Sequence, residues 1–244
     1  MSIVNKFDKG NPSDPILEFN PEMLNQKFFR MTILGASYSG KSIFIKYVYK
    51  YIYKHYNKVV VFTPNFNADF YEDFIYNVVD KSGKTKLETF KYFTNDFDEV
   101  MVMANAIRDS KLEEENILII LDDIISNKAT KNNEFLKLFA SGRHSNISLI
   151  YSIQFMTHEY VNNSLRANSN VIVTTQPSTI QSRGWIKNNL IQNYILSKYP
   201  LLTDAQTNKQ INDKYSEIFE NKYDKAVFYE NQLFKTTGEI CNIK

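Results

Sequence analysis

Residues 32–48 read TILGASYSGKSIFIKYV and contain two glycines five residues apart, although the 244-residue chain has only seven glycines. A lysine and a serine directly follow the second glycine. This spacing matches the phosphate-loop pattern G-x-x-x-x-G-K-[ST], in which backbone N–H groups point at phosphate oxygens and the positive end of the following helix adds to the attraction. The residues that would form the loop are Gly35, Ala36, Ser37, Tyr38, Ser39, Gly40, Lys41 and Ser42.

The flanks of this loop show the context that the pattern requires. Residues 28–34, FFRMTIL, are a short apolar run that predicts a buried strand. In residues 41–55, apolar side chains recur every three or four positions and lysines occupy another face, which predicts an amphipathic helix. We therefore expect the loop to bind a nucleotide, with Lys41 reaching the β and γ phosphates and Ser42 binding Mg²⁺.

Two carboxylates end a strongly apolar run further along the chain. Residues 116–124 read NILIILDDI, which predicts a buried strand that finishes in Asp122 and Asp123. Ligands of open α/β sheets bind at the carboxyl ends of the strands. We expect Asp122 to hold Mg²⁺, directly or through water, and Asp123 to polarise the attacking water. The alternative is a strand that simply ends in polar residues.

Polar residues also border the next apolar run, NISLIYSIQ at 146–154. Gln154 ends this run, and beside the preceding strand its amide would face the γ-phosphate and orient water. Arg143 lies just before the run, where an arginine could stabilise charge on a transferring phosphoryl group of a neighbouring subunit. Arg166 and Arg183 are alternatives for that role. The structural alternatives are a polar cap on the strand and a solvated arginine at a helix end.

Apolar runs alternate with helical patterns over most of the chain. The predicted strands lie at 28–34, 58–65, 116–124, 146–154 and 170–175. Strands that are apolar throughout and alternate with helices predict a mostly parallel sheet covered on both faces, and hence an α/β fold.

The domain organisation follows from the same pattern. We expect an N-terminal arm at 1–27, a P-loop core at 28–178, and a helical extension of the same domain at 179–244. Within that extension, helices are expected around 179–197 and 203–219, followed by a strand at 225–230.

Composition limits the remaining classes of function. The single cysteine excludes an internal disulfide framework and a cysteine-based zinc site, and the three histidines are scattered. The net charge of +2 argues neither for nor against a polyanionic partner. No apolar run approaches the length of about 18 residues that a membrane span needs. We expect a soluble intracellular protein without a signal peptide.

Taken together, GASYSGKS, ILIILDDI, SGRHSNISLIYSIQ and SLRANSNVIV resemble, in this order, the genome-packaging ATPases of large DNA viruses and virophages. These poxvirus-type ATPases belong with the FtsK/HerA pumping ATPases. The resemblance covers about residues 28 to 175, and the GRH…IS…Q string is its most specific part.

The resemblance implies a RecA-like P-loop core of the ASCE type. It also implies an added strand between the two Walker motifs, which are GASYSGKS and ILIILDDI here. It implies a homo-oligomeric ring, with six subunits expected, that threads double-stranded DNA into a preformed capsid and docks on a capsid or portal-vertex protein. Such a protein would act in the virion or in a viral factory of the host cytoplasm. Asp122 and Asp123 resemble the acidic pair of the family, Gln154 its sensor glutamine, and Arg143 the arginine of its GRH string.

Other classes remain as alternatives. NKYD at 221–224 fits the guanine-reading pattern of a GTP-dependent switch, although it does not follow a buried strand. A nucleoside-kinase-like enzyme would share the phosphate loop, and a hexameric DNA helicase would share the ring. A binding module with an inactive loop is a further alternative. Lysine-bearing segments at 80–86 and 126–133 are candidates for DNA-contacting loops, or for solvated surface loops.

Overall fold

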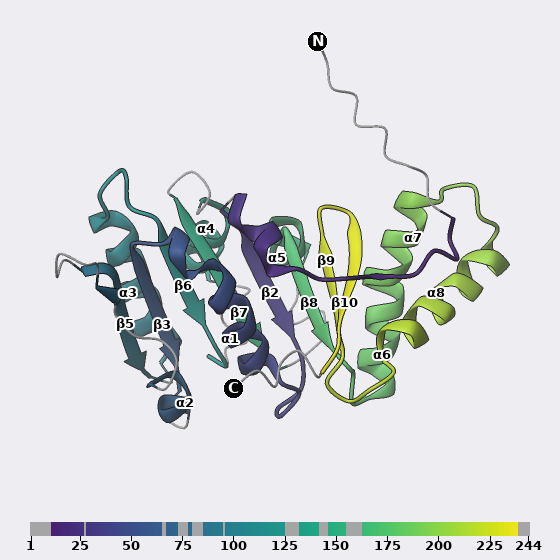
Figure 1. Cartoon of the computed structure of the whole chain (residues 1–244), viewed down its shortest axis with the longest axis horizontal. Coiled ribbons are helices and arrows are strands. Elements are labelled where there is room, and N and C mark those ends of the chain that lie inside the picture. Colours follow the sequence, from purple (N-terminus) through teal and green to yellow (C-terminus); the bar gives the residue numbers. More distant parts are fainter. Residues whose placement is uncertain are drawn as a thin grey trace, which may run out of the picture.

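The computed structural model contains one large sheet with helices on both faces (Figure 1). It describes residues 11–26, 28–64, 67–72, 78–79, 85–94, 96–124, 132–141, 146–154 and 163–238. The strands of these residues form a single ten-stranded sheet with the order β1-β10-β9-β8-β2-β7-β6-β3-β5-β4.

The centre of the sheet is parallel. Its strands are β2 (Arg30–Leu34), β3 (Lys58–Thr63), β5 (Thr85–Phe93), β6 (Ile117–Leu121), β7 (Ile147–Ile153) and β8 (Val171–Thr175). All neighbouring pairs in this group run in the same direction. Every residue of β2, β6 and β7 is buried, because helices cover both faces of the sheet. The expected mostly parallel α/β sheet is confirmed.

Successive side chains of the central strands enter two different cores. Val60 and Ile119 belong to one cluster, which also receives α3 (Phe97–Ser110), α4 (Asn133–Ser141) and the later helices. Val61 and Ile120 belong to the other cluster, which receives α1 (Lys41–Ile52) and the 3-10 helix η1 (Pro21–Gln26). This alternation follows from the two-residue period of a strand.

The remaining helices are short or lie late in the chain. They are η2 (Tyr53–His55), α2 (Ala68–Glu72), α5 (Asn163–Asn168), α6 (Ile180–Ile186), the π-helix η6 (Lys187–Ile191), α7 (Gln192–Lys198) and α8 (Asp204–Ile218). In the described part of the chain, no helix has the length and hydropathy that crossing a membrane requires.

Both ends of the described chain join the sheet. β9 (Lys225–Tyr229) pairs antiparallel with β8, and β10 (Gln232–Thr236) pairs antiparallel with β9. β1 (Leu17–Glu18) then pairs parallel with β10. The sheet therefore extends beyond the strands expected at its centre, using residues from the predicted arm and from the predicted helical extension.

The segment between β3 and β6 contains strands as well as helices. Residues 69–79 have the sequence pattern of a helix, but α2 covers Ala68–Glu72, and β4 (Val78–Val79) pairs antiparallel with β5. β5 mixes polar and apolar residues and pairs parallel with β3. This strand stands between the two motifs in sequence, as the family resemblance implies.

Candidate nucleotide-binding site

The phosphate-loop sequence connects the end of β2 to the start of α1. Gly40 precedes the first helical residue with φ of 81°, a left-handed conformation that glycine adopts without strain. At Gly35, an added Cβ would lie 2.6 Å from the Ser39 hydroxyl oxygen and would collide with the Thr175 side chain. Both glycines are therefore required by the backbone path, and the loop passes close to the end of β8.

The ammonium group of Lys41 is buried inside this loop. Its Nζ donates a hydrogen bond to the Ala36 carbonyl at 3.1 Å and lies 3.2 Å from Asp123 Oδ1. The Asp123 side chain is only 12% exposed, so water screens this ion pair weakly. The lysine is thus held next to the loop backbone that the motif assigns to phosphate binding.

Asp122 is fully buried at the end of β6 and accepts hydrogen bonds from three hydroxyl groups. Ser42 Oγ and Tyr71 OH donate to Oδ2 at 2.7 and 2.8 Å, and Ser152 Oγ donates to Oδ1 at 2.5 Å. Burial raises the pKa of Asp122, and the negative charge of Asp123 raises it further, while the three hydrogen bonds act in the opposite direction.

The oxygens of Ser42 and Asp122 fit a magnesium site. Mg²⁺ prefers hard oxygen ligands and is usually held by one or two protein groups together with water and phosphate oxygens. A hydroxyl and a carboxylate in direct contact at the end of the loop provide such a donor set. No group of three or more His, Cys, Asp or Glu side chains suited to a metal occurs within the described residues.

Asp123 and Gln154 lie at the same edge of the sheet, because β6 and β7 are neighbours. Asp123 has φ of 54°, and its N–H donates to Ser152 Oγ at 3.3 Å. Its side chain points towards Lys41. Gln154 Oε1 accepts a hydrogen bond from Ser37 Oγ at 3.1 Å, which joins β7 to the phosphate loop.

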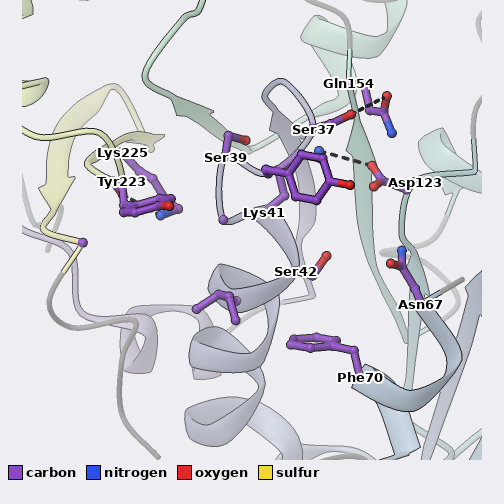
Figure 2. Close-up of a pocket in the computed structure, with 14 residues that line it drawn as sticks. Ser37, Ser39, Lys41, Ser42, Asn67, Phe70, Asp123, Gln154, Tyr223 and Lys225 are labelled. Atoms are coloured by element: carbon purple, nitrogen blue, oxygen red, sulfur yellow. Dashed lines mark hydrogen bonds and ion pairs between the residues drawn. The ribbon is translucent and has the colours of Figure 1, made fainter.

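A cavity of about 910 Å³ brings most of these residues together. Figure 2 shows Lys41 facing Asp123, with Ser42 below them. The cavity is lined by Ser37, Tyr38, Ser39, Gly40, Lys41, Ser42, Ile43, Asn67, Phe70, Asp123, Gln154, Tyr223, Lys225 and Gly238.

Several of the residues at this site do not follow from the sequence motifs. Ser152 is a polar residue within an apolar run, and such a residue in a buried strand indicates a buried hydrogen bond. Tyr71, Tyr223 and Lys225 carry no such signal, since only the tertiary fold brings them to the loop.

Of the candidate arginines, neither Arg166 nor Arg183 lines this cavity. Arg166, in α5, donates to Asn189 Oδ1 at 3.0 Å and lines a different cavity of about 840 Å³. Arg183 is exposed on α6, with its guanidinium 5.9 Å from the centre of the Tyr215 ring. Arg143 lies outside the described residues, as do 80–84 and 126–131 of the lysine-bearing segments.

Comparison with known families gives a match over most of the chain. A family model described as "Poxvirus A32 protein" matches residues 16–231. The DNA packaging protein OPG160 of vaccinia virus (strain Copenhagen) is 29% identical over 143 residues, which cover 58% of this chain and 51% of that protein. The monkeypox virus protein of the same name is 29% identical, with 58% and 46% covered. The chain thus spans about half the length of the curated relatives it matches.

Solved structures share the fold. The genome packaging NTPase B204 of Sulfolobus turreted icosahedral virus 2, in complex with AMPPCP, has a TM-score of 0.58 at 14% identity and covers 89% of this chain and 98% of its own. The pCW3 conjugation coupling protein TcpA, with ATPγS, has a TM-score of 0.55 at 12% identity and covers 87% and 60%. The expected P-loop ATPase fold is confirmed by this likeness.

Proposed function

Because the chain belongs to the Poxvirus A32 protein family, we propose that it is an ATP hydrolase that moves double-stranded viral DNA into a capsid. The names of its curated relatives, DNA packaging proteins of poxviruses, support this role. The observation that carries the proposal is the convergence of Lys41, Ser42, Asp122 and Asp123 at the carboxyl edge of the sheet. These groups match the parts that phosphoryl transfer from a nucleotide requires.

The loop would bind the triphosphate through its backbone N–H groups and Lys41. Ser42 and Asp122 would hold Mg²⁺, which when bound neutralises charge on the β and γ phosphates. The three hydroxyl groups around Asp122 keep both of its oxygens in fixed positions, so the carboxylate is oriented before the metal arrives.

Asp123 is the proposed general base. Its Oδ1 now lies 3.2 Å from Lys41 Nζ. Phosphate oxygens bound in the loop would become the partners of Lys41, and the Asp123 carboxylate would then be able to accept a proton from the attacking water. Gln154, joined to the loop through Ser37, would transmit the state of the γ-phosphate to β7.

The site is proposed to be completed by an arginine from a neighbouring subunit of a ring, with six subunits as the expected number. Arg143 is preferred, because Arg166 is bonded to Asn189 and lines a different cavity. A capsid or portal-vertex protein is the proposed docking partner, and the virion or a cytoplasmic viral factory the proposed location.

Steady-state ATP hydrolysis tests this function directly. The purified protein would be measured alone, with duplex DNA and with single-stranded DNA, with Lys41→Ala as the blank. We expect duplex DNA to stimulate hydrolysis without strand separation. Preference for single strands with unwinding would instead indicate a helicase, and phosphate delivered to a small acceptor would indicate a kinase.

Mixing two inactive variants tests the ring. Lys41→Ala subunits keep Arg143 but lack a working loop, whereas Arg143→Ala subunits keep the loop. If the arginine acts on the neighbouring subunit, mixed rings regain part of the wild-type hydrolysis, while either variant alone shows none and Arg143→Ala still binds ATP. Normal hydrolysis by Arg143→Ala would transfer the role to Arg166 or Arg183.

A further inference from the structure

The C-terminal hairpin reaches the phosphate loop. β9 runs antiparallel to β8, so its first residue, Lys225, pairs with Thr175 at the edge where β8 ends. A Cβ added to Gly40 would lie 3.5 Å from Lys225 Nζ and 3.6 Å from Tyr223 Cδ1. The start of β9 therefore forms a wall of the nucleotide cavity.

Lys225 supplies a buried positive charge to this wall. Lys225 is 0% exposed to solvent, and it lines the cavity. Its Nζ donates to the Tyr223 carbonyl at 2.7 Å and lies 5.9 Å from the centre of the Phe44 ring. An ammonium group in this position can also form a charge-assisted hydrogen bond with a phosphate oxygen bound in the neighbouring loop.

Tyr223 supplies an aromatic ring beside this charge. The residue is 45% exposed, and Lys222 Nζ lies 5.2 Å from the ring centre. Gly238 packs against the base of the tyrosine side chain, since a Cβ added to Gly238 would lie 2.7 Å from Tyr223 Cβ. Gly238 thus fixes the base of the side chain, while the partly exposed residue lines the cavity.

The NKYD sequence at 221–224 forms the turn that positions these two residues. Asp224 is 3% exposed. Its Oδ2 accepts from the Asn221 N–H at 2.6 Å and from Asn221 Nδ2 at 3.2 Å, and its Oδ1 accepts from the Gly238 N–H at 3.0 Å. Both oxygens are engaged in the turn, so this carboxylate does not read a guanine base. The motif is a structural turn, and the GTP-switch interpretation loses its basis.

The direction of a bound nucleotide follows from the two ends of the cavity. Lys41 and Asp123 mark the end where the terminal phosphate would lie. Figure 2 shows Tyr223 and Lys225 on the opposite side of the phosphate loop from Asp123 and Gln154. The nucleoside of a triphosphate in the loop would therefore extend towards the hairpin.

We propose that Tyr223 stacks on the base of the nucleotide and that Lys225 contacts the phosphate nearest the ribose. This inference rests on the proposed nucleotide binding. The competing aromatic side chain is Phe70, which also lines the cavity. Its ring contacts Tyr71, the tyrosine bonded to Asp122, and has Lys46 Nζ 5.8 Å from its centre, which places it at the magnesium side.

Displacement of a fluorescent ATP analogue by unlabelled ligands separates the two contacts. ATP carries a base, whereas inorganic tripolyphosphate carries only the phosphate chain. We expect Tyr223→Ala to weaken ATP about tenfold, the usual scale of a lost base–aromatic stack, and to leave tripolyphosphate unchanged. Tyr223→Phe should bind both ligands as the wild type does. Tyr51→Ala is the matched control, because Tyr51 is 37% exposed on α1 and does not line the cavity.

Lys225→Met should weaken ATP and tripolyphosphate alike, by about tenfold, because the contact is with phosphate. Thermal melting checks that this variant folds, and the Tyr223 series carries the test if it does not. Equal ATP affinity in Tyr223→Ala and wild type would overturn the proposal, as would a selective loss of ATP in Phe70→Ala. A wild type that binds neither ligand would instead refute the proposed nucleotide function itself.

Discussion

Asp122 combines full burial with a negative charge, and this has consequences for stability. Its carboxylate touches Ser42, Tyr71 and Ser152, which come from three different elements. These hydrogen bonds lower its pKa, but burial and the neighbouring Asp123 have the larger effect, so the pKa is raised. The ionised form is therefore less stable in the folded protein than in the unfolded chain.

Asp122→Asn should stabilise the metal-free protein at pH 7. A carboxyl group whose pKa is raised on folding contributes stability below its unfolded pKa, ordinarily 3.8, and loses it as the pH rises through the higher folded pKa. Asparagine avoids that loss, and we expect a gain of about 1 kcal/mol, or about 2–4 °C in Tm for a chain of this size. Melting curves with a chelator between pH 4 and 8 should show this gain vanish at the acid end.

A lower Tm for Asp122→Asn at pH 7 would contradict this account of the buried charge. The same variant should lose magnesium-dependent hydrolysis, because an amide is a poorer ligand for Mg²⁺ than a carboxylate.

Tyr71→Phe should raise the magnesium concentration needed for half-maximal ATP hydrolysis by about tenfold, the lower range for loss of a group that orients a metal ligand. Burial and the negative charge of Asp122 raise the pKa of Tyr71, which keeps its hydroxyl protonated and donating to the carboxylate. Tyr151→Phe is the control, since Tyr151 is equally buried but packs against Phe135. A magnesium titration that is the same for both variants would rule out the positioning role.

At the scale of elements, the first turn of α1 depends on the backbone conformation of the residue before it. Gly40 adopts φ of 81°, and the helix begins at Lys41 with Gly40 as its N-cap. An L-residue with a side chain is disfavoured in this conformation. The position of Lys41 at the start of α1 therefore depends on the glycine at position 40.

Gly40→Ala and Gly184→Ala should have opposite effects. At Gly40 the alanine would be strained by about 1–2 kcal/mol, lowering stability and weakening ATP binding. Gly184 lies within α6 with no heavy atom within 4 Å of an added Cβ, so alanine should stabilise the helix by about 1 kcal/mol without changing ATP binding. Urea unfolding and ATP titration measure both effects, and stabilisation by Gly40→Ala would refute the strain.

At the scale of the whole molecule, the two ends of the described chain are joined. β1 pairs with β10, and the Ile16 N–H donates to Glu217 Oε1 at 2.5 Å. Lys214 also donates to the Asp14 carbonyl. The predicted arm therefore pairs with the outer strand of the C-terminal hairpin and is hydrogen-bonded to α8. The other strand of that hairpin, β9, begins with Lys225.

Phe19→Ala tests how much the packing of the N-terminal arm contributes to the stability of the fold. Phe19 is 1% exposed and its ring centre lies 6.2 Å from that of Phe44 and 6.1 Å from that of Phe234. Removing it should cost about 3–5 kcal/mol of unfolding free energy. Leu17→Ala is the control, because Leu17 is 64% exposed and should change stability by less than about 0.5 kcal/mol. Chemical unfolding that gives similar losses for both would show that the arm is not part of the core.

The sequence by itself determined the phosphate loop, the central strands and the acidic residues that follow β6. These features depend on neighbours along the chain: the spacing of two glycines and a lysine, the length of an apolar run, and the period of a helix. Because parallel strands end at one edge, placing Asp122, Asp123 and Gln154 near the loop needed only that β2, β7 and β6 be neighbours in the sheet.

Only the tertiary structure decided which side chains complete the site. Tyr71 reaches Asp122 across 51 positions of the chain, and Lys225 reaches Gly40 because β9 pairs with β8 in one register. NKYD at 221–224 shows the limit most clearly, since its letters fit a guanine reader but its carboxylate is used inside a turn. The role of a polar side chain depends on which partner it forms hydrogen bonds with. That partner is set by packing between elements that are distant in sequence.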